Sequence, residues 1–267
     1  MKQELLFTNP SESNGFDSGL IAFYKLNGNV IDESGNRYDG SVNGAIYNAN
    51  GKEGGCYEFE KATKNNIELP STISDFFYPP NSFTISAWVN AFGDSPNEGA
   101  TVFHAIPDYY CHTHITLKDS FLGGNVLYYG DKVGNHINLN QWYHVVLVWD
   151  NVSAIQKIYI NGVQETTIGF FGVAGRAKWC GLGNCERGDL EWDGLIDYVR
   201  LYNYAKSENE IIESLKRENI PCSKVGEFTE LNSGISMVSN GQIREMKYYE
   251  TDPYWSAFFK ASNSGWK

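Results

Sequence analysis

Two histidines, His112 and His114, stand two residues apart in a run of alternating character. Side chains two positions apart on a strand share a face. The residues that alternate with them are more apolar, so we expect both imidazoles to point outward. A His-x-His pair can hold a transition metal when a third ligand comes from a neighbouring strand; His104 is available, but nothing in the sequence places it there. The alternatives are hydrogen-bonded histidines without a ligand, or polar groups of a ligand-binding face.

Aromatic side chains make up 15% of the chain, and several adjoin expected loops. Sugar sites place an aromatic face beneath the C–H groups of the sugar ring and flank it with Asp, Asn or His side chains that bind hydroxyls. Packing inside the core is the competing interpretation for each aromatic residue, and most of all for Trp88. The predicted ligand-binding residues are Tyr109, Tyr110, His112, His114, Tyr128 and Trp179.

The segment from Asp32 to Gly40 reads DESGNRYDG and is rich in oxygen-bearing side chains. Hard cations prefer carboxylate and carbonyl oxygens on a loop that can wrap around them. Asp, Asn and Gly also favour turns that close by hydrogen bonds from backbone amides to their own side chains. The segment therefore predicts either a cation site or a self-contained turn.

The net charge of −11 disfavours a nucleic-acid partner, because binding to phosphate backbones requires a basic surface. No apolar run approaches the roughly 18 residues of a membrane span, and the first ten residues lack the apolar core of a signal peptide. The five cysteines are an odd number, so at least one lacks a partner within the chain. Cys180 and Cys185 are close enough in sequence to bridge a loop, although spacing alone does not establish a disulfide.

Alternating and apolar runs bounded by Gly, Asn and Asp predict many short strands. A short helix is expected at 207–215, because Ser207 and Glu210 form a capping box. Asn161 and Gly162 predict a tight hairpin turn. The expected strands are 20–26, 56–60, 67–69, 83–91, 101–106, 111–117, 126–129, 141–150, 155–162, 163–168, 178–182 and 194–202.

Five of these stretches, in order, resemble the laminin G-like, concanavalin A-like lectin family: LIAFYKLNGNVIDESGNRYDG, FTISAWV, QWYHVVLVWD, IQKIYING and GLIDYVRLY. The resemblance covers about residues 19–216. It implies an all-β, two-sheet antiparallel jelly-roll sandwich. It also implies that the first turn and the last strand lie close together, so that Asp32, Asn36, Gly40 and Asp197 would share a structural calcium ion. The competing interpretation has Asp197 bonded to backbone amides.

Some enzymes of this fold carry Glu-x-Asp-x-Glu on one strand, which places an acid and a nucleophile on the same face. Here the order is Asp189-x-Glu191-x-Asp193, and Gly194 follows where that strand should continue. A solvated acidic loop is therefore favoured over a catalytic pair, and we expect no enzyme.

Three parts are expected: a flexible lead-in at 1–18, the sandwich at 19–216, and a C-terminal extension at 217–267. The extension is too aromatic for an unstructured tail, and we expect it to pack on the sandwich, to bind other protein chains or to begin a further domain. The preferred hypothesis is a non-catalytic module of an extracellular or cell-surface protein that binds a glycan or glycoprotein. The alternatives are an adhesive module of a surface or virion assembly and, least favoured, a glycoside hydrolase.

Overall fold

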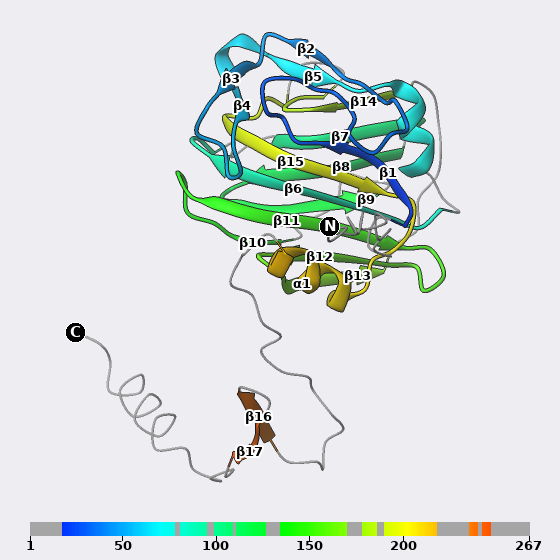
Figure 1. The fold of residues 1–267 in the computed structure, drawn as a ribbon, viewed down its shortest axis with the longest axis vertical. Coiled ribbons are helices and arrows are strands. Elements are labelled where there is room, and N and C mark those ends of the chain that lie inside the picture. Colours follow the sequence, from blue (N-terminus) through cyan, green and yellow to red (C-terminus); the bar gives the residue numbers. More distant parts are fainter. Residues whose placement is uncertain are drawn as a thin grey trace, which may run out of the picture. The chain divides into compact units, whose positions relative to one another are not determined.

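The computed structural model describes residues 18–77, 81–94, 99–108, 111–126, 134–169, 178–185, 190–217, 235–239 and 242–246. The chain divides into two units, Met1–Cys222 and Ser223–Lys267. The first unit is a sandwich of two antiparallel sheets (Figure 1), which confirms the predicted all-β jelly-roll class. No helix of the described part is long and apolar enough to cross a membrane.

In the described residues, the larger sheet has eight strands in the order β13-β12-β11-β6-β15-β4-β3, and β1 pairs with the far part of β15. Its centre is β15, which hydrogen-bonds to β6 along most of its length. The strands are β1 (Leu20–Tyr24), β3 (Ile46–Asn48), β4 (Cys56–Phe59), β6 (Phe83–Ala91), β11 (Trp142–Asp150), β12 (Ile155–Ile160), β13 (Val163–Gly169) and β15 (Gly194–Tyr202).

The second sheet has seven strands among the described residues, in the order β10-β9-β8-β7-β14-β5-β2. Two short 3-10 helices, η1 (Lys61–Thr63) and η2 (Ser71–Phe77), flank β5 in the chain. The strands are β2 (Ser41–Asn43), β5 (Asn66–Glu68), β7 (Ala100–Asp108), β8 (Cys111–Lys118), β9 (Phe121–Val126), β10 (Gly134–His136) and β14 (Trp179–Leu182).

The predicted strand at 126–129 shares Val126 with β9, but β9 begins five residues earlier, at Phe121, and ends at Val126; residues 127–129 lie outside the described part. The sequence of β9, FLGGNV, was not expected to form a strand, since two central glycines weaken the β signal. Pairing with β8 on one side and β10 on the other stabilises it nonetheless.

The core lies between the two sheets and is built from the inward faces of their strands. The alternate residues Phe83, Ile85, Ala87 and Val89 of β6 are fully buried in this core. Trp192 also belongs to it and is 1% exposed. This tryptophan is therefore a packing residue.

The alternation of side chains along β15 is interrupted near its middle. Pairing with β6 runs regularly to Asp197 and resumes at Arg200 after a register shift, and Tyr198 has a left-handed φ of 52°. This bulge inserts an extra residue, which resets the side-chain alternation. As a result Ile196 and Val199 both reach the core, although they are three residues apart.

The helix α1 (Glu208–Arg217) packs against the outer face of the eight-stranded sheet (Figure 1). Its predicted capping box is confirmed: Ser207 Oγ accepts a bond from the Glu210 amide, and Glu210 Oε2 accepts one from the Ser207 amide. Ile211 packs with Val146, Val148 and Tyr159, while Leu215 packs with Trp88 and Tyr198. Trp88 is therefore also a packing residue, and β11 is apolar on both faces because both are covered.

The expected tight turn between β12 and β13 is confirmed, since Asn161 and Gly162 have φ of 51° and 81°. In the second unit β16 (Ile235–Ser239) and β17 (Gln242–Met246) form an antiparallel pair. Cys56, Cys180 and Cys185 are buried, and within the described structure Cys180 and Cys185 are not joined by a disulfide.

Candidate ligand-binding face

A row of polar positions crosses the outer face of the seven-stranded sheet. His104 of β7 lies directly opposite His114 of β8 on one side and Gly181 of β14 on the other. Gly181 in turn lies opposite Glu68 of β5. Directly opposite residues of neighbouring strands share a face, so this row brings two imidazoles and a carboxylate onto one surface.

Trp179 completes this group because it stands two residues before Gly181 on the same strand. Its ring centroid lies 5.7 Å from that of His104 at an interplanar angle of 65°, and the His104 ring lies 5.9 Å from that of His114. His104 and His114 are 2% and 7% exposed, Trp179 is partly buried, and Glu68 is exposed. We call Glu68, His104, His114 and Trp179 the outer-face cluster.

The outer-face cluster combines groups that suit a sugar. A partly exposed indole offers a flat apolar surface to the C–H face of a ring, while the exposed Glu68 carboxylate can accept hydrogen bonds from hydroxyls. The buried histidines support the indole from one side, since edge-to-face ring contacts favour a fixed geometry. The cluster is therefore a candidate platform for ring stacking with polar groups at its margin.

Of the predicted ligand-binding residues, His114 and Trp179 come together in this cluster. His112 lies in β8, but its side chain is outside the described structure, as are Tyr109, Tyr110 and Tyr128. His104 links the other two rings and was not among the predicted ligand-binding residues; Glu68 was missed entirely. The signal that could have found His104 is the pairing of β7 with β8, which depends on a register shift between Ala105 and Asp108.

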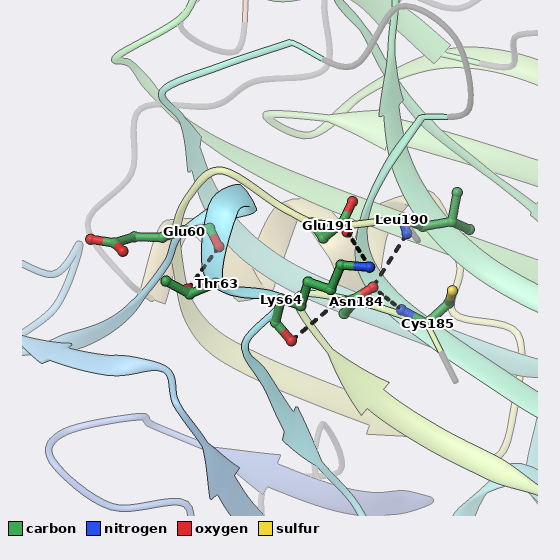
Figure 2. Close-up of polar contacts among 7 residues, drawn as sticks. All are labelled: Glu60, Thr63, Lys64, Asn184, Cys185, Leu190 and Glu191. Atoms are coloured by element: carbon green, nitrogen blue, oxygen red, sulfur yellow. Dashed lines mark hydrogen bonds and ion pairs between the residues drawn. The ribbon is translucent and has the colours of Figure 1, made fainter. Parts of the chain in front are cut away.

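The end of β14 is fixed by Asn184, which is fully buried (Figure 2). Its Oδ1 accepts hydrogen bonds from the amides of Cys185 (2.8 Å) and Leu190 (3.3 Å), and its Nδ2 donates to the carbonyl of Lys64 (3.4 Å). One side chain thereby joins the turn before β5 to the loop after β14. These are the two strands that carry Glu68 and Trp179.

In the acidic run before β15, Glu191 and Asp193 are the described acids, and both contact neighbouring segments. Glu191 lies 3.8 Å from the exposed ammonium group of Lys64 (Figure 2), and the Asp193 carbonyl accepts a hydrogen bond from the Phe92 amide. Glu186 and Asp189 lie outside the described residues. Among the described acids, the contacts therefore connect the loop to its neighbours.

The predicted cation loop is a turn organised by Asp32. Its Oδ1 accepts hydrogen bonds from the amides of Phe23 and Ser34, and its Oδ2 accepts from the Ser34 hydroxyl and the Tyr38 amide, all at 2.9–3.0 Å. Burial alone raises the pKa of Asp32, but these donors outweigh it and hold the pKa below its usual value. Asn36 Nδ2 donates to the carbonyls of Leu20 and Ile21, which ties the same turn to β1.

Asp197 of β15 is bonded to a different segment. Its Oδ2 accepts hydrogen bonds from the amides of Lys52 (2.8 Å) and Glu53 (3.1 Å). The side chain is fully buried, and within the described structure its Oδ1 accepts no hydrogen bond. Burial raises the pKa of Asp197 to about 7, against the opposing influence of the Glu53, Lys52 and Tyr198 amides.

These contacts do not fit a calcium site shared by Asp32, Asn36, Gly40 and Asp197. Both oxygens of Asp32 already accept two hydrogen bonds each, Asn36 turns its amide nitrogen to carbonyls, and Asp197 faces the 52–53 segment. The Gly40 amide donates to the Val30 carbonyl. Nor do the described residues contain a cluster of three His, Cys, Asp or Glu side chains arranged to hold a metal ion.

The two-sheet antiparallel fold is that of concanavalin A-like sandwich domains. A family model described as the concanavalin A-like lectin/glucanases superfamily (Laminin_G_3) matches residues 61–212. The chain belongs to this family. A search of curated protein sequences gives no match.

Solved structures with the same fold include one domain of an extracellular enzyme and binding domains of toxins. Domain 4 of AbnA, a GH43 extracellular arabinanase from Geobacillus stearothermophilus, was solved with arabinotriose; it is 24% identical, with a TM-score of 0.57 over 73% of this chain and 97% of that one. The binding domain of Paraclostridial Mosquitocidal Protein 1 is 15% identical, with a TM-score of 0.61 over 76% of this chain and 53% of that one.

A structure of botulinum neurotoxin type C, whose cell entry depends on interaction with two ganglioside molecules, is 16% identical. Its TM-score is 0.54 over 79% of this chain and 53% of that one. This chain therefore matches about half of each of these two toxin structures. At these identities the likeness shows a common fold.

Replacing Asn184 should destabilise the sandwich. Asn184→Ala leaves the buried amides of Cys185 and Leu190 without their acceptor, and each unsatisfied buried group costs about 1–3 kcal/mol. We expect the free energy of unfolding in urea to fall by about 2 kcal/mol or more. Asn135→Ala is the matched control, because Asn135 is exposed; its Nδ2 donates to Glu165 and its Oδ1 accepts from the His136 amide, both within reach of water. It should change stability by less than about 0.5 kcal/mol.

Asp197 should make stability depend on pH. Its pKa in the folded state, about 7, lies above the ordinary value of 3.8, so the folded protein holds this proton more tightly than the unfolded chain. The resulting stability is fully present below about pH 4 and is lost as pH rises through about 7. Urea unfolding at several pH values measures it.

In Asp197→Asn this part of the pH dependence should vanish, whereas Asp193→Asn should retain it. An identical slope in wild type and Asp197→Asn between pH 4 and 7 would contradict the assignment.

Proposed function

We propose that the protein is a non-catalytic carbohydrate-binding module of an extracellular or cell-surface protein. Its ligand is a glycan or the glycan of a glycoprotein, bound on the outer face of the seven-stranded sheet. The observation that carries this proposal is the partly exposed Trp179 ring, set edge-to-face against His104 beside a cross-strand row that also contains Glu68.

The two faces of the sandwich differ in a way that supports this choice. On the eight-stranded sheet, α1 covers the outward side chains of β6, β11, β12 and β15 with an apolar contact. The outer face of the seven-stranded sheet instead carries polar groups beside an indole. Carbohydrate sites are built from such mixtures, whereas packing interfaces are predominantly apolar.

The related folds indicate which glycans to test first. Arabinotriose was present in the arabinanase domain, and gangliosides are named for the type C neurotoxin. These are neutral pentose oligomers and sialylated glycolipids, so they sample two different chemistries. We therefore choose arabino-oligosaccharides and ganglioside oligosaccharides as the first probes.

Trp179→Ala tests the site. The assay is a glycan array that includes both probe classes, and the wild type should bind at least one glycan. The affinity of Trp179→Ala for that glycan should be about tenfold lower or weaker still, because aromatic residues that stack on a ligand are typical binding hot spots. Trp142→Ala is the matched control: Trp142 is a partly buried tryptophan that packs near α1 on the other sheet. Equal affinity of wild type and Trp179→Ala, or absence of binding to every glycan, would contradict the proposal.

Calcium stays a prediction that rests on the family resemblance, and it has its own test. If the ion contributes to stability, the unfolding temperature in excess calcium should exceed that in EGTA by several degrees, since a ligand that binds only the folded state stabilises it. Asp32→Asn should abolish the difference. Equal unfolding temperatures in calcium and EGTA would contradict the prediction of a calcium ion. The four hydrogen bonds that the Asp32 carboxylate already accepts favour that result.

A further inference from the structure

Gly181 of β14 is required by its close neighbours, the Trp179 ring and the Ile67 carbonyl, rather than by its own backbone angles. It is not among the residues with a left-handed φ, so an alanine could adopt its backbone conformation. A Cβ built on it, however, would lie 2.6 Å from Cη2 and 2.7 Å from Cζ2 of Trp179. Real Cβ contacts are longer than this, so the indole occupies the space that any side chain at position 181 would need.

The position of Gly181 in the sheet explains why this space matters. It lies between Glu68 on β5 and His104 on β7 in the same cross-strand row. Trp179 precedes it by two residues and so projects from the same face. Because position 181 has no side chain, the far edge of the Trp179 indole contacts the strand at Gly181, which lies between Glu68 and His104.

We propose that Gly181 is a positioning residue for ligand binding: it lets the Trp179 ring lie down against the sheet, so that one face of the ring is presented to a sugar. This inference rests on the proposed function for its biological meaning. A tryptophan lifted off the strand would present its edge instead and would separate from Glu68 and His104. Gly181 thereby sets the orientation of the Trp179 ring, and the face of that ring is what contacts the sugar.

A second contact of the missing Cβ requires a control. It would also lie 2.8 Å from the Ile67 carbonyl oxygen of the paired strand β5. Gly181→Ala therefore introduces two clashes at once, one with the Trp179 ring and one with the Ile67 carbonyl oxygen. Gly124→Ala of β9 is the control for the clash with a backbone carbonyl. Its Cβ would lie 2.6 Å from the His114 carbonyl oxygen, and it would face the core beside Leu147, away from the indole.

The ring orientation can be measured in the wild-type protein without ligand. An aromatic ring lying over a glycine shifts the Hα resonances of that glycine strongly upfield. We expect such a shift for Gly181 in the NMR spectrum, and we expect it to disappear in Trp179→Ala. Ordinary Hα shifts for Gly181 in the wild type would overturn the proposal, whatever the behaviour of the variants.

Gly181→Ala then tests the consequence for binding. With 5-fluorotryptophan incorporated, the 19F resonance of Trp179, assigned with Trp179→Phe, should move in Gly181→Ala and stay in place in Gly124→Ala. Affinity for the strongest array glycan, or for arabinotriose if several bind alike, should fall about tenfold in Gly181→Ala. An unmoved resonance, or unchanged affinity with a moved resonance, would overturn the positioning role.

The failure of this inference is distinguishable from failure of the proposed function. If no glycan binds, or if Trp179→Ala binds as the wild type does, the proposed function fails. The Hα and 19F shifts still decide whether Gly181 sets the orientation of the ring. A double variant, Gly181→Ala with Trp179→Ala, supplies the stability comparison, because the clash with the ring is then absent and only the backbone contact remains.

Discussion

Burial of α1 on the eight-stranded sheet is the constraint that the rest of the structure depends on. The helix places Ile211 against Val146 and Val148, and Leu215 against Trp88 and Tyr198. Each large apolar side chain buried in this way contributes about 1.5–3 kcal/mol. The outer side of that sheet is therefore committed to packing along β6, β11, β12 and β15. A ligand-binding role then belongs to a different surface, and the outer-face cluster lies on the opposite sheet.

Buried polar side chains connect separate segments of this sandwich by hydrogen bonds. Asp32 collects four donors within the first turn and binds it to β1, Asp197 holds the 52–53 segment over β15, and Asn184 connects the loops that flank β5 and β14. All three are buried, so their hydrogen bonds are shielded from competing water. The same residue types that suggest a metal site in the sequence thus form structural hydrogen bonds, and those of Asn184 anchor the chain just after β14, which carries Trp179.

Most of the fold could be predicted from the sequence, because strands buried on one or both faces leave a clear pattern in the side chains. Phe83–Ala91 and Gly194–Tyr202 have the predicted bounds. The candidate site was less predictable, since it depends on register. Asp108 pairs with Cys111, and a regular ladder from that pair would set His104 opposite Ile115; the shift between Ala105 and Asp108 moves it opposite His114 instead. A bulge of this kind leaves no signature in the order of residues, and the same holds for the bulge after Asp197.

The central claim is that a glycan binds on the outer face of the seven-stranded sheet. Chemical-shift mapping on isotope-labelled protein, titrated with a glycan that binds on the array, tests it most directly. The account predicts saturable shifts concentrated on the Trp179 indole N–H, the His104 and His114 rings and the Glu68 amide, with α1 and the outward residues of β11 unchanged. Shifts concentrated on α1 and β11, with the outer-face cluster unmoved, would contradict it.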